Sequence, residues 1–329
     1  MISELLTIVI PTRDRPELLE KCLGSIFECQ PVMPHVMVSD NSTCDQPAMA
    51  ALRRKYDFVY VRQSGDLNMV QHWNTCLELP STPWELMLHD DDELYPDSLG
   101  NLEPFLVDCD GVGIVVGGIQ FINFQGEAVR QWIPPSKGKF MGEEGLVRLG
   151  LDWKVRPPGI IVNVPASLQA GGFVGIEGLP ADYTFALQLA YSYGVAFFPA
   201  LVGRYRLSPY QQTNFSTPEK TADWLEFSRR QAEVVQTFGC SDTIAARIVD
   251  YMTWWPFLTL APRWLSSQSS FVFKLTQHCV RQSPRGGDWQ LRARRQYPFL
   301  FSRPYWLAWS LLRELHKPVR LVKRLRRQK

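Results

Sequence analysis

Three consecutive carboxylates, Asp90, Asp91 and Asp92, follow the apolar run 84–88 in the stretch LMLHDDDELYP. Carboxylates this close repel one another by about 1 kcal/mol per pair in water, and by more in a dry site. A divalent cation would turn that repulsion into attraction, because Mg²⁺ and Mn²⁺ prefer carboxylate oxygens. A solvated acidic turn at the end of a strand is the alternative. Whether the triplet is a metal site or a solvated turn depends on the elements that surround it.

Short β-branched runs alternate with helical patterns through the first hundred residues, which predicts an α/β fold with a doubly wound, mostly parallel sheet. The predicted strands lie at 5–10, 35–40, 58–62 and 84–89, and the predicted helices at 16–28 and 68–78. Ligands of such sheets bind outside the carboxyl ends of the strands. Three polar loops, 11–15, 40–45 and 89–93, follow strand ends. We expect them to meet on one rim, which favours a site over an arbitrary acidic turn.

The middle of the chain continues with β-rich and helical segments and then changes character. The patterns predict a β hairpin within 112–135, a helix at 142–150, strands at 159–164 and 195–207, and a helix at 181–194. Beyond Thr217 the chain becomes helical and rich in aromatic residues. We therefore predict a sheet domain over 1–215 and a helical C-terminal region over 216–329.

The composition of the chain excludes several classes of protein. A 45% hydrophobic content over 329 residues excludes a disordered chain. Seven scattered cysteines without a C-x-x-C pair argue against a disulfide framework and a zinc cage, and favour a reducing cytoplasm. The acidic residue and short apolar run of MISELLTIVIP do not suit a signal peptide. The longest apolar stretches hold about a dozen residues, so we expect no transmembrane helix.

The C-terminus is strongly basic, since residues 281–329 contain fourteen Lys and Arg against two acidic residues. Within 304–327, apolar residues at helical spacing alternate with a basic face that includes Arg320, Lys323 and Arg327. This pattern predicts a helix that lies on an anionic membrane surface, at the inner face of the cell membrane. A packed helix with a frayed basic end is the alternative. Nucleic-acid binding is less favoured, because no known module accompanies the basic run.

The order of the motifs resembles the family 2 glycosyltransferases of the GT-A fold over residues 5–207. The matching pieces are TIVIPTRDRPELLEKCLGSI, VMVSDNSTCD, NMVQHWNTCLE, LMLHDDDELYPDSL, GGF and ADYTFALQLA. Each piece alone is weak, but together and in order they are specific. The resemblance implies transfer of a sugar from a nucleoside diphosphate donor to a hydroxyl group. It also implies a divalent metal, Mn²⁺ or Mg²⁺, that stabilises the leaving diphosphate.

The resemblance assigns roles to individual residues. Asp91 stands where the family's metal ligand falls, Asp92 is a second candidate, and His89 replaces the commoner leading Asp of the DXD motif. Asp182 stands where inverting members carry the base that deprotonates the acceptor, although Ala181 replaces the usual Glu. The residues implied in nucleotide binding are Pro11, Thr12, Arg13, Asp14, Asp40, Asn68 and Asp90.

Purely structural roles remain open for several of these residues. Asp40 suits an Asx-turn, the arginines at 13 and 15 suit a solvated turn, and Asp182 suits a helix N-terminus. Arg204 and Arg206 suit either diphosphate contact or packing at the edge of the core.

The resulting hypothesis is an inverting, metal-dependent glycosyltransferase of the bacterial surface-polysaccharide kind, which includes O-antigen assembly. The donor is a UDP or dTDP sugar by preference, and the acceptor is a saccharide, expected on a lipid carrier. A nucleotidyltransferase of related fold is one rival, although PTRDRPE lacks the glycine expected of its phosphate loop. A two-carboxylate glycosidase fits the triplet poorly. A non-catalytic scaffold that binds nucleotide is the third rival.

Overall fold

The structure is a computed structural model. It describes residues 1–45, 47–63, 66–135, 137–151, 156–174, 181–208, 233–260, 272, 276, 279, 280 and 287–297. Contacts between Cα atoms divide the chain into two compact units. Unit 1 comprises Met1–Asn214 and Glu233–Ile244, and unit 2 comprises Phe215–Ala232 and Ala245–Lys329.

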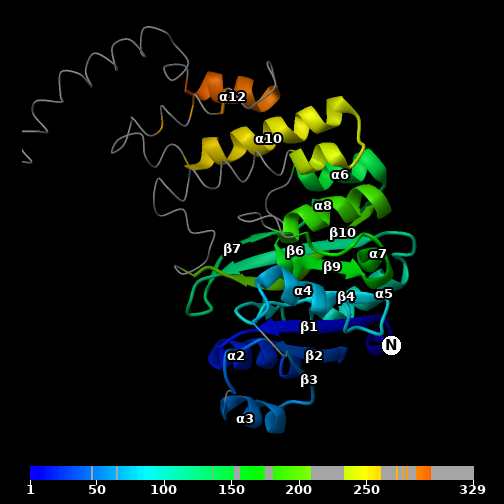
Figure 1. Cartoon of the computed structure of the whole chain (residues 1–329), viewed down its shortest axis with the longest axis vertical. Helices are drawn as coiled ribbons and strands as arrows, with labels where there is room; N and C mark the ends of the chain where they lie inside the picture. The colour runs from blue at the N-terminus through cyan, green and yellow to red at the C-terminus, as the bar shows by residue number, and fades with distance from the viewer. Residues whose placement is uncertain are drawn as a thin grey trace, which may run out of the picture. The chain divides into compact units, whose positions relative to one another are not determined.

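Unit 1 is built around one sheet with the strand order β3-β2-β1-β4-β9-β6-β10-β5 (Figure 1). Two further strands leave this path, because β7 pairs with β6 and β8 pairs with β10. The strands are β1 (Leu6–Thr12), β2 (His35–Asp40), β3 (Val59–Arg62), β4 (Trp84–Met87), β5 (Glu93–Leu94), β6 (Ile114–Ile122), β7 (Ala128–Trp132), β8 (Gly138–Phe140), β9 (Ile160–Asn163) and β10 (Val195–Arg206).

The first four strands along the chain are parallel, as predicted. The second half of the sheet is mixed, because β9 runs antiparallel to both β4 and β6, whereas β6 and β10 are parallel. The predicted α/β fold is confirmed, with antiparallel strands confined to this half and its edges. Since β1, β2 and β4 are parallel neighbours, their carboxyl ends lie at one edge of the sheet.

The helices of unit 1 connect these strands. They are α1 (Ile2–Leu5), α2 (Pro16–Phe27), α3 (Pro47–Lys55), α4 (Met69–Leu77), α5 (Ser98–Val107), α6 (Gly142–Gly150), α7 (Val164–Gln169) and α8 (Ala181–Tyr193), with a 3₁₀ turn at Pro157–Gly159. In α2, Pro16 occupies the first turn and the spaced residues Leu19, Leu23 and Ile26 are fully buried. They join Ile8 and Ile10 of β1 in the main core cluster.

Unit 2 contains most of α10 (Asp242–Leu260), and α12 (Asp288–Gln296). Asp250 of α10 accepts hydrogen bonds from the backbone N–H groups of Trp289 (2.7 Å) and Gln290 (3.2 Å) at the start of α12. A carboxylate suits this place, because the first N–H groups of a helix have no partner within the helix. Within the part of the chain that the structure describes, every helix is too short or too polar to cross a bilayer.

Candidate active site

The three polar loops meet on one rim of the sheet, as the sequence predicts. The hydroxyl of Thr12, at the end of β1, donates to Asp90 Oδ2 at 2.7 Å, beyond the end of β4. The backbone N–H of Asp14 donates to Ser42 Oγ at 2.9 Å, after β2. The parallel order β2-β1-β4 therefore brings together residues that are up to 78 positions apart in the sequence.

Asp90 is fully buried and carries the closest ion pair of the triplet. Its Oδ1 atom lies 2.5 Å from Nη2 of Arg15, whose side chain is 47% exposed. Burial raises the pKa of Asp90 to about 7, although Arg15 acts in the opposite direction. Buried carboxylates need such partners, because an isolated charge in a dry site is costly.

The other two carboxylates lie beside a histidine. Oxygen atoms of Asp91 and Asp92 and a ring nitrogen of His89 all lie within 4.8 Å of one another. Asp92 accepts the backbone N–H of Arg206 through Oδ1 at 2.8 Å, whereas its buried Oδ2 has no hydrogen-bond partner. Burial and the neighbouring Asp91 raise the pKa of Asp92. An orphaned carboxylate oxygen beside two further ligand atoms fits a divalent cation.

Two arginines of β10 pair with Glu93, the residue that follows the triplet. The guanidinium of Arg206 pairs with Glu93, donates to the carbonyl of Asp91 at 2.9 Å and is 2% exposed. Arg204 pairs with the same Glu93 and donates to the carbonyl of Gly126 at 2.6 Å. The structure therefore supports the packing alternative for both arginines. Arg206 thereby fixes the backbone of the acidic loop at Asp91.

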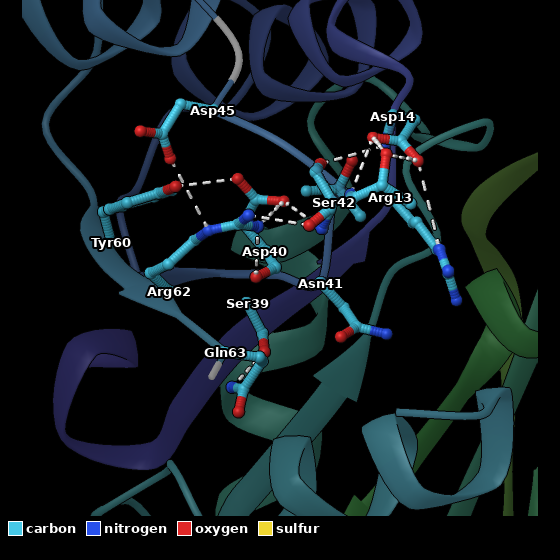
Figure 2. A network of polar contacts seen from close by, with 12 residues as sticks. Arg13, Asp14, Ser39, Asp40, Asn41, Ser42, Asp45, Tyr60, Arg62 and Gln63 are labelled. Atoms are coloured by element: carbon cyan, nitrogen blue, oxygen red, sulfur yellow. Dashed lines mark hydrogen bonds and ion pairs between the residues drawn. The ribbon is translucent and has the colours of Figure 1, made fainter. Parts of the chain in front are cut away.

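The loop after β1 is locked against the loop after β2 (Figure 2). Asp14 has a φ of 57°, a left-handed conformation that Asp tolerates better than most residues. Its carboxylate accepts from the backbone N–H and the hydroxyl of Thr43 at 3.0 and 3.2 Å. Arg13 extends the other way and donates to Leu67 O and Asp66 Oδ1, both at 3.4 Å. Pro11 and Thr12 are the buried last residues of β1.

Asp40 is a hub of the polar network in Figure 2 and is 1% exposed. Its Oδ1 accepts the backbone N–H of Ser42 at 2.8 Å, which is an Asx-turn, and lies 3.3 Å from Nη1 of Arg62. Its Oδ2 accepts the Tyr60 hydroxyl at 2.7 Å. A nucleobase that donated a hydrogen bond to Oδ2 would share this oxygen with the Tyr60 hydroxyl. The role of Asp40 in base recognition stays a prediction.

The two asparagines of the α4 region have local partners. Asn68 caps the N-terminus of α4 through a capping box with Gln71, and its side chain is exposed to solvent. Asn74 both donates to and accepts from the backbone of Phe173, at 2.9 and 2.7 Å. Asn74 thereby fixes the glycine turn that carries Phe173. A nucleotide-binding role for Asn68 stays a prediction.

Asp182 lies in the first turn of α8 and faces the same hollow as His89. The hollow measures about 420 Å³ including its open mouth, and its other walls are apolar. They are formed by Trp73, Leu77, Met87, Pro157, Ile160, Val162, Phe173, Phe185 and Ala186. Burial raises the pKa of Asp182 and lowers the pKa of His89. A carboxylate with a raised pKa is the better proton acceptor.

Three residues that contribute to this site had no functional role assigned from the sequence alone. His89 joins the cluster of candidate metal ligands, and Trp73 stacks on its ring at 5.1 Å. Arg15 reaches both Asp90 and Asp91, at 2.5 and 3.6 Å. The signal for Arg15 was its place in the polar loop 11–15 at the end of a predicted strand. The signal for Trp73 was its helical spacing of four residues from Leu77, which alone does not separate packing from function.

The match to a known protein family lies within unit 1. Residues 7–156 match the family model described as Glycosyl transferase family 2. No curated protein sequence matches the chain.

Two solved proteins illustrate the structural similarity. S. aureus TarS 1–349 in complex with UDP-GlcNAc superposes with a TM-score of 0.63 at 14% identity, over 85% of this chain and 82% of that chain. The mannosyltransferase PcManGT from Pyrobaculum calidifontis, with GDP-Man and Mn²⁺, gives a TM-score of 0.54 at 13% identity, over 93% and 83%. At such identities the similarity establishes the fold.

Proposed function

Since this chain belongs to glycosyltransferase family 2 and has the GT-A fold, we propose that it is an inverting, metal-dependent glycosyltransferase. It moves a sugar from a nucleoside diphosphate donor to a hydroxyl of a saccharide. One observation carries the proposal: a cluster of candidate metal ligands, His89, Asp91 and Asp92, lies beside the hollow that Asp182 faces. The proposed site for the leaving diphosphate and the proposed base therefore border the same hollow.

The proposed metal ligands are Asp91 and Asp92, with His89 as a third. The orphaned Oδ2 of Asp92 supports this assignment. A bound Mn²⁺ or Mg²⁺ would supply a positive charge that stabilises the departing diphosphate. Mn²⁺ occurs in the PcManGT complex.

Donor binding is assigned to the rim formed by the loops after β1, β2 and β4. In this proposal Pro11, Thr12, Arg13 and Asp14 line the nucleotide, Asp90 faces the ribose, Asp40 accepts from the base, and Asn68 lies along the donor. A carboxylate acceptor at Asp40 favours a pyrimidine such as uracil or thymine, whose N3–H is a donor. The solved neighbours hold UDP-GlcNAc and GDP-Man, so they support a nucleotide sugar and leave the base open.

Asp182 is the proposed base. Its carboxylate takes the proton of the acceptor hydroxyl while that oxygen forms the new bond to the anomeric carbon. The bond from the anomeric carbon to the diphosphate oxygen breaks on the opposite side, which inverts the configuration. Burial of Asp182 raises its pKa and so increases its affinity for that proton.

The proposed acceptor is a saccharide on a lipid carrier, in polysaccharide or O-antigen assembly at the cytoplasmic membrane face. The support is the basic amphipathic pattern of residues 304–327, which lie outside the described residues.

The test is release of nucleoside diphosphate from a panel of UDP, dTDP and GDP sugars, with Mn²⁺ or with EDTA. We expect turnover with at least one donor, its loss in EDTA, and a loss of at least about 100-fold in Asp91→Ala. Glu78→Gln, at an exposed position after α4, is the control and keeps activity. Equal turnover by wild type and Asp91→Ala with Mn²⁺ contradicts the proposal.

A further inference from the structure

Arg15 forms ion pairs with two carboxylates of the acidic triplet. It follows the turn after β1 and precedes the first residue of α2, where its side chain makes no capping hydrogen bond. Nη2 lies 2.5 Å from Asp90 Oδ1, and Nη1 lies 3.6 Å from Asp91 Oδ2. Arg15 therefore bridges the buried carboxylate of Asp90 and the partly exposed carboxylate of Asp91.

The neighbouring arginine cannot take over this task. Arg206 reaches the same loop, but its guanidinium is committed to Glu93 and to backbone carbonyls, including that of Asp91. Arg206 is also 2% exposed, whereas the Arg15 side chain is 47% exposed. Arg15 therefore places its charge beside the triplet, and its half-exposed side chain has room to move away from it.

A divalent cation at His89, Asp91 and Asp92 would compete with Arg15 for Asp91. Both are cations, and they would lie close to the same carboxylate, so each weakens the binding of the other. A diphosphate bound to that metal would then offer Arg15 a new anionic partner, and a guanidinium forks well onto phosphate oxygens.

We propose that Arg15 is a resident counter-cation of the metal site, which passes from Asp91 to the diphosphate of the donor when metal and donor bind. This inference rests on the proposed function. It implies that metal alone binds weakly, because Arg15 already pairs with Asp91. It also implies that metal and nucleoside diphosphate bind cooperatively, because the binding of either ligand favours the movement of Arg15 that the other requires.

The experiment measures Mn²⁺ binding without nucleotide by electron paramagnetic resonance, and UDP, dTDP and GDP binding with and without Mn²⁺ by calorimetry. Arg15→Gln removes the charge and keeps most of the stem. We expect it to bind Mn²⁺ alone about five- to tenfold more tightly than wild type. We expect it to bind nucleoside diphosphate in Mn²⁺ about tenfold more weakly. The cooperativity between the two ligands then shrinks.

Arg13→Gln is the matched control for Mn²⁺ alone. Arg13 lies on the same loop with a similar exposure of 44%, and it pairs with Asp14 and Asp66. Its loss should leave Mn²⁺ affinity within about twofold of wild type. Arg15→Lys keeps the charge without the fork, so it should bind Mn²⁺ as wild type does and bind nucleoside diphosphate less tightly.

The outcomes separate this inference from the proposed function. Folded Arg15→Gln that binds Mn²⁺ no more tightly than wild type overturns the inference. Should Arg15→Gln not fold, Arg15→Lys decides: an unchanged affinity for nucleoside diphosphate in Mn²⁺ overturns it. Wild type that binds neither Mn²⁺ nor any nucleoside diphosphate overturns the proposed function itself.

Discussion

At the scale of single residues, Asp182 is the proposed base that deprotonates the acceptor hydroxyl. It shares the hollow with His89, and none of the residues proposed to bind the nucleotide lines that hollow. We predict that Asp182→Asn keeps donor affinity within about threefold of wild type and lowers the release of nucleoside diphosphate by about 100-fold or more, because an amide cannot accept the proton. Calorimetry with donor and a coupled release assay check the two halves. A parallel loss of donor affinity and turnover would instead place Asp182 in donor binding.

Glu85 in β4 is a buried carboxyl that the proposed mechanism does not use. It is fully buried, and neither carboxyl oxygen has a hydrogen-bond partner. Burial raises the pKa of Glu85 well above its ordinary value. The folded state therefore binds the proton more tightly than the unfolded chain does. The stability that Glu85 contributes is complete below about pH 4.3 and is lost as the pH rises towards its folded-state pKa.

We predict that Glu85→Gln becomes progressively more stable than wild type as the pH rises from 5 to 8, because Gln has no proton to lose. Melting temperatures at each pH measure the difference between the two proteins. Glu78→Gln, at an exposed site, should show no such trend. A difference between Glu85→Gln and wild type that stays constant or shrinks with rising pH contradicts the prediction.

At the scale of elements, the turn at Gly171 and Gly172 positions Phe173, which lines the hollow. Gly172 has a φ of +71°, and a Cβ atom there would lie 2.4 Å from Asn74 Oδ1. Gly171 has a φ of +84°, but a Cβ atom there would meet no atom within 4 Å. Both glycines thus have left-handed backbones, and Gly172 alone of the two is crowded.

We predict that Gly171→Ala costs about 1 kcal/mol in the free energy of unfolding, from backbone strain. We predict that Gly172→Ala costs about 2 to 3 kcal/mol, because it also breaks the paired hydrogen bonds between Asn74 and Phe173. Urea denaturation of the two variants measures the difference. Equal costs would mean that Asn74 moves aside freely.

The sequence predicts elements well where one local pattern dominates. The predicted helices at 16–28 and 68–78 correspond to α2 and α4, and the predicted helix at 142–150 corresponds to α6. These segments have clear helical periodicity or an N-terminal signal such as Pro16. The antiparallel pairing of β9 between β4 and β6 was not predictable, because strand direction depends on the path of distant loops.

The site was predictable in its location and less so in its contacts. Strand-end loops in a parallel sheet must share an edge, which is why the meeting of Thr12 with Asp90 follows from the pattern. The pairing of Arg206 with Glu93 joins residues 113 positions apart on antiparallel strands. No local signal predicts such a pair, so packing and diphosphate binding could not be separated before the fold was known.

At the scale of the whole molecule, charge is distributed very unevenly. The net charge is +2, yet residues 281–329 alone contain fourteen Lys and Arg and two acidic residues. The remainder is therefore acidic, which suits the carboxylates gathered around Asp90. A basic end on an acidic body favours one orientation on an anionic surface.

We predict that the basic C-terminus binds anionic membranes. The full chain should sediment with vesicles that contain phosphatidylglycerol and stay in solution with pure phosphatidylcholine, and binding should fall in high salt. Replacing Lys323, Arg324 and Arg327 by Gln should weaken vesicle binding at least about tenfold, since each basic residue near the surface contributes about 1 kcal/mol.

The matched control replaces three exposed arginines of α12, Arg292, Arg294 and Arg295, by Gln. The change in net charge is the same, so only placement differs between the variants. If residues 304–327 form the membrane-binding helix, the α12 variant retains most of its affinity. Equal losses in the two variants would mean that net charge alone attracts the protein, and that the amphipathic pattern of the C-terminus does not bind the membrane.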